Sequence, residues 1–365
     1  EKALRYDLTV PFARFVVMHQ NEIDFPFKRY QIQSVWRADR PQRGRFREFY
    51  QCDADVVGAS GLVQELEFIQ LYDRVFHDLG LKGVTIKLNH RKVLSGIAEV
   101  IGAGDRLTDF TVALDKLDKI GREKVEAEMR QKGISQQAIR LAAPLFEMQG
   151  NAGEQVGALR AMLEGSPTGL EGVSELEELL AETRSLGLPA SECQLDVTLA
   201  RGLNYYTGTI FEVAAPEGVN MGSIGGGGRY DDLTGIFGLK DVSGVGISFG
   251  LDRIYLVLEE LGLFPEALDQ SLEVFSLNFG GKAGKAALKL VLQLRTLGIR
   301  ADLYPNDSKI SKQFKYADKR NVPYVILIGD EELENGNFTV KDMQSGSQQA
   351  YALEDWETFG ESLKP

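Results

Sequence analysis

The chain changes its residue pattern three times along its length. Residues 27–57 and 194–213 alternate apolar and polar side chains, as half-buried strands do. Between them, residues 104–190 are rich in Glu, Lys, Ala, Leu and Gln, with helical spacing and short glycine breaks. After about Pro265, strand-like and helix-like segments alternate with short connections. This order predicts a strand-rich domain interrupted by helices, followed by a separate α/β domain.

The expected fold is therefore an α+β domain with an antiparallel sheet, formed by residues 1–103 and 191–264. Residues 104–190 form the expected helical insertion, and residues 271–365 form a small α/β domain with a mainly parallel sheet. Pro265 and the acidic residues after it predict a linker. The glycine-rich run GSIGGGG, Gly222 to Gly228, predicts a turn.

Composition excludes several classes of protein. The longest apolar runs are far shorter than the roughly 18 residues that a membrane-spanning helix needs. The two cysteines, Cys52 and Cys193, lack CxxC spacing, and the chain has only three histidines. Neither a disulfide framework nor a Cys/His zinc site is expected, and this cysteine usage favours a reducing cytoplasm.

The net charge of -12 argues against a protein that coats nucleic acid nonspecifically, because phosphate binding needs a basic surface. The charge is unevenly distributed. Residues 1–60 carry ten Lys/Arg against eight Asp/Glu, a net of +2, whereas residues 104–190 carry ten against fifteen, a net of -5. A protein that meets one polyanion at a defined site fits this distribution, and so does an acidic enzyme with a phosphate pocket.

Five arginines lie within the eleven residues from Arg37 to Arg47, in a loop between two predicted strands. Guanidinium groups stay charged and match phosphate oxygens with planar donors. A solvated basic turn would have the same composition. The aromatic Phe49 and the polar Gln51 and Asp55 alternate after the loop on one strand face, which favours a binding site.

This run, from Trp36 to Gly58, resembles the ATP-binding arginine motif of class II aminoacyl-tRNA synthetases, and most closely that of the histidyl branch. The resemblance implies that Arg37 contacts the α-phosphate and the activated carboxylate. It places Asp39 near the adenine edge, Arg45 toward the outer phosphates and Phe49 against the adenine ring.

Three further motifs carry the resemblance. GVGISFGLDRIYL is similar to the third class II signature and implies that Arg253 lies across the adenine from Phe49. RGLNYYTG and GGGGRYDDL resemble signatures of histidyl-tRNA synthetases that the wider class does not share. By this likeness Arg201 offsets charge at the α-phosphate. The implied catalytic residues are Arg37, Arg201 and Arg253. The family more often has Asp where this chain has Asn204.

The start of the chain, LRYDLTVPFARF, resembles the family's strand that binds the amino acid. In that likeness Asp7 pairs with the substrate α-ammonium and Thr9 helps to orient it. In the same likeness, a carboxylate and the hydroxyl of Tyr206 would form hydrogen bonds with the two imidazole nitrogens. A smaller or apolar amino acid would leave these two protein groups without partners. The implied histidine-binding residues are Asp7, Leu8, Thr9, Gln51, Asp55, Tyr205 and Tyr206.

The likeness extends from Leu4 to about Gln349, and its last part resembles the anticodon-binding domain of several class II synthetases. Basic residues recur there, either as a tRNA contact or as a salt-bridged helix surface: Lys309, Lys312, Lys315, Lys319 and Arg320. The first class II signature, which forms the dimer interface, is expected to precede Glu1. The resemblance therefore implies a cytoplasmic homodimer that binds ATP with Mg²⁺, L-histidine and histidine tRNA.

The implied activity is that of a histidine-tRNA ligase, working through a histidyl-adenylate. Two alternatives lie outside catalysis. A regulatory paralogue that activates ATP phosphoribosyltransferase usually lacks the C-terminal domain, so residues 271–365 argue against it. A silent sensor of uncharged tRNA would not need the ATP and histidine contacts that this chain retains. Synthetases for threonine, proline or glycine share the C-terminal module, but RGLNYYTG is the wrong signature for them.

Overall fold

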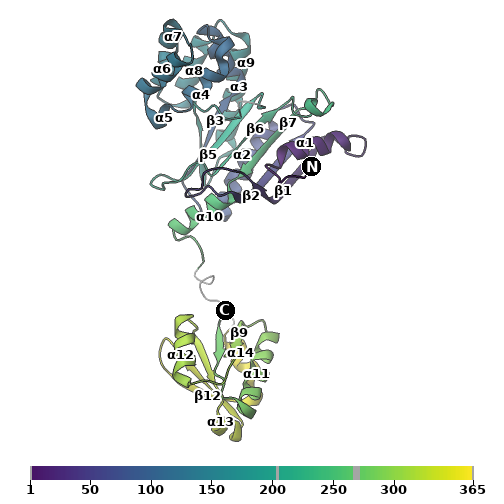
Figure 1. Ribbon diagram of the computed structural model, residues 1–365, viewed down its shortest axis with the longest axis vertical. Coiled ribbons are helices and arrows are strands. Elements are labelled where there is room, and N and C mark those ends of the chain that lie inside the picture. Colours follow the sequence, from purple (N-terminus) through teal and green to yellow (C-terminus); the bar gives the residue numbers. More distant parts are fainter. Residues whose placement is uncertain (1, 203–204, 266–271, 364–365) are drawn as a thin grey trace. The chain divides into compact units, whose positions relative to one another are not determined.

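The structure, a computed structural model, describes residues 2–202, 205–265 and 272–363. The chain divides into two compact units, residues 1–263 and 264–365 (Figure 1). Most of the predicted linker after Pro265 lies outside the described residues. The boundaries predicted between the catalytic part and the insertion, inside the first unit, remain a prediction.

A seven-stranded sheet forms the centre of the first unit, in the order β1-β2-β7-β6-β5-β3-β4. Neighbouring strands are antiparallel except β3 and β4, which run parallel because the helical segment crosses over between them. The antiparallel sheet predicted from the sequence is confirmed. The strands are β1 (Phe27–Trp36), β2 (Glu48–Val57), β3 (Val84–His90), β4 (Ser191–Leu195), β5 (Thr209–Ala214), β6 (Gly225–Tyr230) and β7 (Gly244–Phe249).

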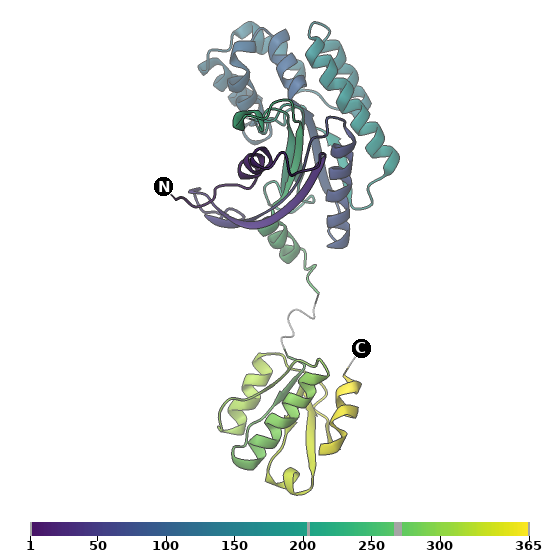
Figure 2. The ribbon, with the colours of Figure 1, turned by 90° about the vertical axis from the view of Figure 1, so that its right-hand side faces the viewer.

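Two helices lie on opposite faces of this sheet, α1 (Thr9–Met18) and α2 (Val63–Asp78) (Figure 2). Phe12 and Val16 of α1 pack in one cluster with Val57 of β2. Since side chains alternate along a strand, Asp53 and Asp55 share the face of Val57. The face that carries α1 is therefore also the face that carries the polar residues of β2.

The segment between β3 and β4 contains only helical elements, and it includes residues 104–190, the predicted insertion. Its last helix, α9, packs along α3 at a close crossing, where a Cβ on Gly96 would lie 2.6 Å from the Cα of Gly169. The insertion is thereby fixed to the end of the sheet. The elements are α3 (Arg91–Val100), η1 (Gly104–Arg106), α4 (Leu107–Leu114), α5 (Leu117–Ile120), α6 (Arg122–Gln131), α7 (Gln136–Phe146), α8 (Ala152–Met162) and α9 (Pro167–Leu186).

The turn predicted for GSIGGGG is wrong, because Gly225 to Gly228 form most of the central strand β6. The glycines allow close packing on both sides of this strand. A Cβ on Gly227 would lie 2.2 Å from the carbonyl oxygen of Gly246, and one on Gly225 would lie 3.0 Å from the ring of Tyr72. Glycine in a strand interior often marks such close backbone approach. After β6 come η2 (Gly235–Phe237) and, following β7, the helix α10 (Leu251–Glu260).

The second unit has a five-stranded sheet in the order β12-β11-β10-β8-β9. The pairs of β8 with β9 and with β10 are parallel, as predicted. The strand β11 pairs antiparallel with β10, after a connection that contains α13, and with β12 through a hairpin loop of residues 343–347. The elements are β8 (Val274–Ser276), α11 (Gly281–Thr296), β9 (Ala301–Leu303), α12 (Ile310–Lys319), β10 (Tyr324–Leu327), α13 (Asp330–Glu334), β11 (Asn337–Asp342), β12 (Gln348–Ala352), η4 (Leu353–Asp355) and α14 (Trp356–Ser362).

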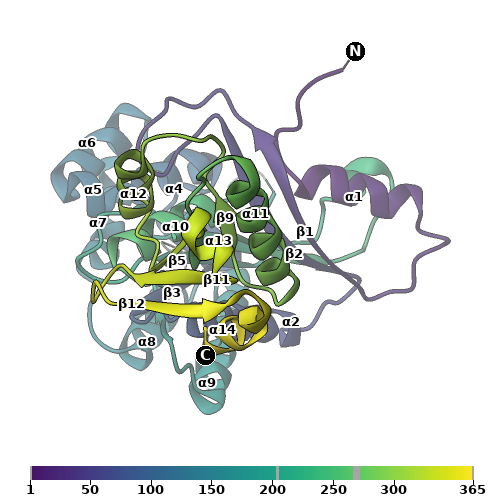
Figure 3. The same cartoon turned by 90° about the horizontal axis from the view of Figure 1, so that it is seen from below.

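Helices cover both faces of this second sheet, with α11 and α12 on opposite sides (Figure 3). Val274 and Ile326 belong to the apolar cluster under α11 and α14. Their neighbours Phe275 and Val325 point the other way, into the cluster under α12. The α/β domain predicted from the sequence is therefore present. Within the described parts of the chain, no helix combines the length and the apolar character needed to cross a membrane.

Candidate active site

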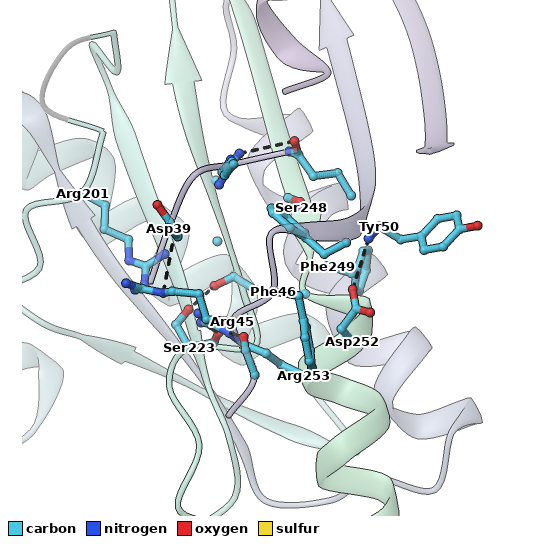
Figure 4. A pocket seen from close by; sticks show the side chains of 18 of the residues that line it. Asp39, Arg45, Phe46, Tyr50, Arg201, Ser223, Ser248, Phe249, Asp252 and Arg253 are labelled. Atoms are coloured by element: carbon cyan, nitrogen blue, oxygen red, sulfur yellow. Dashed lines mark hydrogen bonds and ion pairs between the residues drawn. The ribbon is translucent and has the colours of Figure 1, made fainter. Parts of the chain in front are cut away.

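A cavity of about 510 Å³ lies where the loop between β1 and β2 meets β6, β7 and the start of α10 (Figure 4). Tyr50 turns its ring away from this space, while its backbone N–H donates to Asp252 Oδ2 at 3.1 Å. All six residues predicted to bind ATP line the cavity. They are Arg37, Asp39, Arg45, Phe49, Arg201 and Arg253.

Three of the arginines, Arg45, Arg201 and Arg253, approach one another at one side of this cavity (Figure 4). The backbone holds Arg253, whose Nε donates to the Gly44 carbonyl at 2.7 Å and whose Nη1 donates to the Ser223 carbonyl at 2.6 Å. Burial lowers the pKa of Arg253, and the charges of Arg45 and Arg201 lower it further. Three neighbouring cations held in this way favour an anionic ligand.

The side chain of Arg201 forms an ion pair with Glu212 on β5. The backbone segment just before Arg201 is held in place by Asn89, which is buried at the end of β3. The Nδ2 of Asn89 donates to the carbonyls of Val197 at 3.2 Å and Leu199 at 2.8 Å. The substitution noted at Asn204 lies outside the described residues.

Arg37 lies against two aromatic rings, with its Cζ 4.7 Å from the centroid of Tyr6 and 5.1 Å from that of Phe49. Its Nε donates to the Tyr6 carbonyl at 3.2 Å, and its Nη2 donates to Gln51 Oε1 at 3.3 Å. The guanidinium is therefore oriented before any ligand binds. Gln51 connects it to a second, smaller cavity.

This second cavity, of about 60 Å³, shares Gln51, Tyr205 and Tyr206 with the larger one. Five of the seven residues predicted to bind histidine line it: Thr9, Gln51, Asp55, Tyr205 and Tyr206. Glycine makes room for the aromatic wall, since Gly202 has a φ of 65° and a Cβ there would lie 1.7 Å from the ring of Tyr206. The geometry can hold a small ligand between polar groups.

Asp7 and Leu8 are not among the described residues that line either cavity. Leu8 is buried, and its carbonyl accepts a hydrogen bond from Arg29 Nη2 at 3.2 Å. Asp7 Oδ1 accepts the backbone N–H of Val10 at 3.2 Å, at the start of α1. The structure thus gives both residues a local partner, and their predicted contacts with histidine stay predictions.

Asp55 is held by two residues to which the sequence had given no role. Its Oδ2 lies 2.8 Å from Arg29 Nη2, and its Oδ1 accepts the hydroxyl of Tyr230 at 2.8 Å. Burial raises the pKa of Asp55 to about 7, although Arg29 and Tyr230 favour the charged form. The alternation of Arg29 with Gln31 and Gln33 along β1 was the sequence signal that could have indicated a polar strand face.

A buried ion pair supports the segment that carries the two tyrosines. Arg229 Nε and Nη2 donate to the two carboxylate oxygens of Glu65, at 2.5 and 2.6 Å. The same guanidinium donates to the carbonyls of Ala59 and Gly61, both at 2.9 Å. The backbone of Arg229 in turn accepts the N–H of Thr207 at 2.8 Å. The strand β6, the start of α2 and the RGLNYYTG segment are therefore linked through one arginine.

Comparison with known proteins gives a consistent result. A family model described as histidyl-tRNA synthetase matches residues 2–254, and one described as an anticodon binding domain matches residues 273–360. The chain belongs to the histidyl-tRNA synthetase family. This confirms the family, and with it the class II fold, that the arginine motif and RGLNYYTG predicted.

Relatives within this family cover nearly the whole chain. A histidine–tRNA ligase from Christiangramia forsetii is 66% identical over 95% of this chain and 76% of its own length. One from Flavobacterium johnsoniae is 62% identical over 95% of this chain and 73% of its own length. The solved histidyl-tRNA synthetase of Nostoc sp. PCC 7120 is 32% identical, with a TM-score of 0.81 over 99% of this chain and 83% of that chain.

Proposed function

We propose that the protein is a histidine-tRNA ligase, which joins L-histidine to its tRNA at the expense of ATP. The observation that carries this proposal is the junction of two cavities. The larger is lined by four arginines suited to phosphates, and the smaller by buried carboxylates and tyrosines suited to a cationic amino acid. Gln51 lies between them and touches Arg37.

In the first step, a carboxylate oxygen of histidine attacks the α-phosphorus of ATP. Histidyl-adenylate forms and pyrophosphate leaves. In the second step, a ribose hydroxyl of the terminal tRNA adenosine attacks the activated carbonyl, and AMP leaves. No side chain acts as a covalent nucleophile. Arg37 and Arg201 place positive charge where negative charge develops on the α-phosphate, and Arg253 and Arg45 hold the outer phosphates.

The small cavity gives a physical reason for histidine specificity. Asp55 accepts a hydrogen bond from one imidazole nitrogen, and the hydroxyl of Tyr206 meets the other. Asp55 is buried, and Tyr206 is partly buried. An amino acid with an apolar side chain leaves these groups without partners, which costs more than a poor fit of shape alone.

Magnesium fits this site as an ion that arrives with ATP. No cluster of three or more His, Cys, Asp or Glu placed for a metal occurs among the described residues. Mg²⁺ commonly keeps several waters and binds substrate phosphates with few protein ligands. When bound, it would neutralise phosphate charge, and the lining carboxylates Asp39 and Asp252 are the candidates to hold it.

For the second unit we propose contact with the anticodon arm of the tRNA. The helix α12 buries Gln313 and Ala317 against its sheet and leaves its lysines exposed. An exposed row of cations on one helix can contact phosphates in register. The residues proposed for this contact are Lys309, Lys312, Lys315, Lys319 and Arg320.

The homodimer and the cytoplasmic location also remain proposals. Support for a second copy comes from apolar side chains that the first unit exposes on the edge strand β1 and on α1. Tyr30 is 80% and Met18 65% exposed. Tyr30 and Ile32 are alternate residues of this edge strand and are both exposed, and apolar side chains gathered on one strand face are typical of protein interfaces. Support for the cytoplasm comes from two free cysteines, Cys52 and Cys193.

The non-catalytic alternatives are not favoured. A regulatory paralogue without an anticodon domain does not match a chain whose residues 273–360 fit that domain. A silent sensor has no need of the four arginines that converge on one cavity.

Charging of tRNA tests the proposed function. With ATP, Mg²⁺ and labelled histidine, the protein is expected to transfer label to histidine tRNA, and far less to an unrelated tRNA. Boiled protein serves as the control. Failure to label histidine tRNA, while the protein remains folded, would count against ligase activity.

Histidine binding is expected to depend on pH through Asp55. Its pKa of about 7 means that the free protein holds a proton on this carboxyl at pH 6. Accepting a hydrogen bond from imidazole requires the ionised form, so binding at pH 6 releases that proton. Affinity is therefore expected to rise by up to about tenfold per pH unit below pH 7 and to level off above it.

Isothermal titration calorimetry in buffers of different ionisation enthalpy measures this proton release. Histidine itself titrates near the same pH, so the Asp55→Asn variant supplies the control. The difference between wild type and variant isolates the contribution of Asp55. An identical pH dependence in both proteins would contradict the assignment.

A further inference from the structure

Three polar residues of β2 form a row on the site face of the sheet. Gln51, Asp53 and Asp55 pair across β1 with Gln33, Gln31 and Arg29. Alternate residues on a strand lie roughly 6.5 to 7 Å apart, so the row is long enough to follow an amino acid from end to end. All three β2 residues line the smaller cavity.

The two carboxylates of this row differ in their partners. Asp55 is anchored at both oxygens, by Arg29 and by Tyr230, each at 2.8 Å. Asp53 is equally buried, at 3% exposure, but has no ion pair of its own among the described residues. It accepts from Gln51 Nε2 at 3.2 and 3.4 Å and from the side chain of Ser248. Asp53 is thus the carboxylate with capacity left for a ligand.

Position along the row then distinguishes the ligand groups. Arg37 donates to Gln51 at one end of the row, where the reacting carboxylate of histidine belongs. Asp55 is at the other end, where the imidazole belongs. Asp53 lies between them, opposite the α-carbon. We propose that Asp53 accepts a hydrogen bond from the α-ammonium of bound histidine and is a further substrate-binding residue of this site.

Charge supports the same assignment. Asp55 is paired with Arg29, whereas Asp53 has no such partner among the described residues, and Arg37 bonds only the amide of Gln51 in this row. A ligand cation beside Asp53 would therefore offset a carboxylate charge that burial disfavours. The residue predicted for this task, Asp7, is bonded to the N–H of Val10 and is not among the described lining residues. The inference rests on the proposed histidine-tRNA ligase function and adds a residue to it.

The test compares Asp53→Asn with wild type in histidine-dependent exchange of pyrophosphate into ATP. Asparagine keeps the size of the side chain and removes its charge. The KM for histidine is expected to rise about tenfold or more, as for the loss of a charged hydrogen bond, and the KM for ATP to stay within about twofold. Cys52→Ser is the matched control, because Cys52 is adjacent but does not line either cavity.

A ligand without the ammonium group distinguishes a contact from a general disturbance. The inhibition constant of 3-(imidazol-4-yl)propionate, which keeps the imidazole and carboxylate, is expected to be nearly the same for wild type and Asp53→Asn. Equal weakening of histidine and this analogue would overturn the proposal, as would an unchanged KM for histidine. If wild type itself shows no exchange that depends on histidine, the proposed function fails and not the role of Asp53.

Discussion

An Arg201→Ala variant is expected to lose about two to three orders of magnitude in kcat for histidine-dependent pyrophosphate exchange. Arg201 lines the larger cavity beside Arg45 and Arg253, and an ion pair with Glu212 orients its side chain. In the proposed reaction, its cation stabilises charge that develops on the α-phosphate in the transition state. An interaction made mainly in the transition state lowers kcat more than it raises KM when it is removed.

Arg43→Ala is the matched control for this experiment. Arg43 lies in the same arginine-rich loop, but it pairs with Glu260 at the surface and does not line the described cavities. Both variants remove one positive charge from the first unit. Exchange by Arg43→Ala is expected to stay within about twofold of wild type, because exposed ion pairs contribute little. If both variants lost activity equally, the special role of Arg201 would be refuted.

A Glu65→Ala variant is expected to destabilise the first unit by about 3 to 5 kcal/mol. Glu65 is fully buried, and its two oxygens accept from Arg229, which is 5% exposed. Removing the carboxylate leaves a buried guanidinium without its bidentate partner, and of the described residues only the more distant Asp231, 3.9 Å from Arg229 Nη1, remains as an ion-pair partner. For a unit of this size the loss corresponds to a drop of about 10 °C in Tm, which differential scanning calorimetry measures.

Arg74→Ala, on the same helix α2, provides the comparison. Arg74 pairs with Asp78 at the surface, where both side chains are more than half exposed. Its removal is expected to leave the Tm unchanged within error. A Glu65→Ala variant as stable as Arg74→Ala would show that the buried pair does not hold β6 and α2 together.

The site residues that could be predicted are those whose chemistry is concentrated in one stretch of chain. Arg37, Arg45 and Phe49 follow one another in a loop and an adjoining strand, and the structure brings them to one cavity. Arg201 and Arg253 were predicted through the family's motifs, and they converge there too. The antiparallel sheet and the helical insertion followed from residue periodicity, which local sequence carries directly.

The residues that were missed act through partners distant in sequence. Arg29 meets Asp55 because β1 and β2 pair in one register, and Tyr230 meets it because β6 lies two strands away from β2. No local pattern gives a strand order. The turn predicted for the glycine run was wrong for a similar reason. Glycine is rare in strands, and only the close packing of β7 against β6 requires it at Gly227.

We propose that the two joined cavities activate histidine and no other amino acid. Exchange of labelled pyrophosphate into ATP, measured with each standard amino acid in turn, tests this most directly. We expect rapid exchange with histidine and almost none with the others, because in the proposed site only an imidazole satisfies both Asp55 and Tyr206. Equal exchange with all amino acids, or none with histidine, would contradict it.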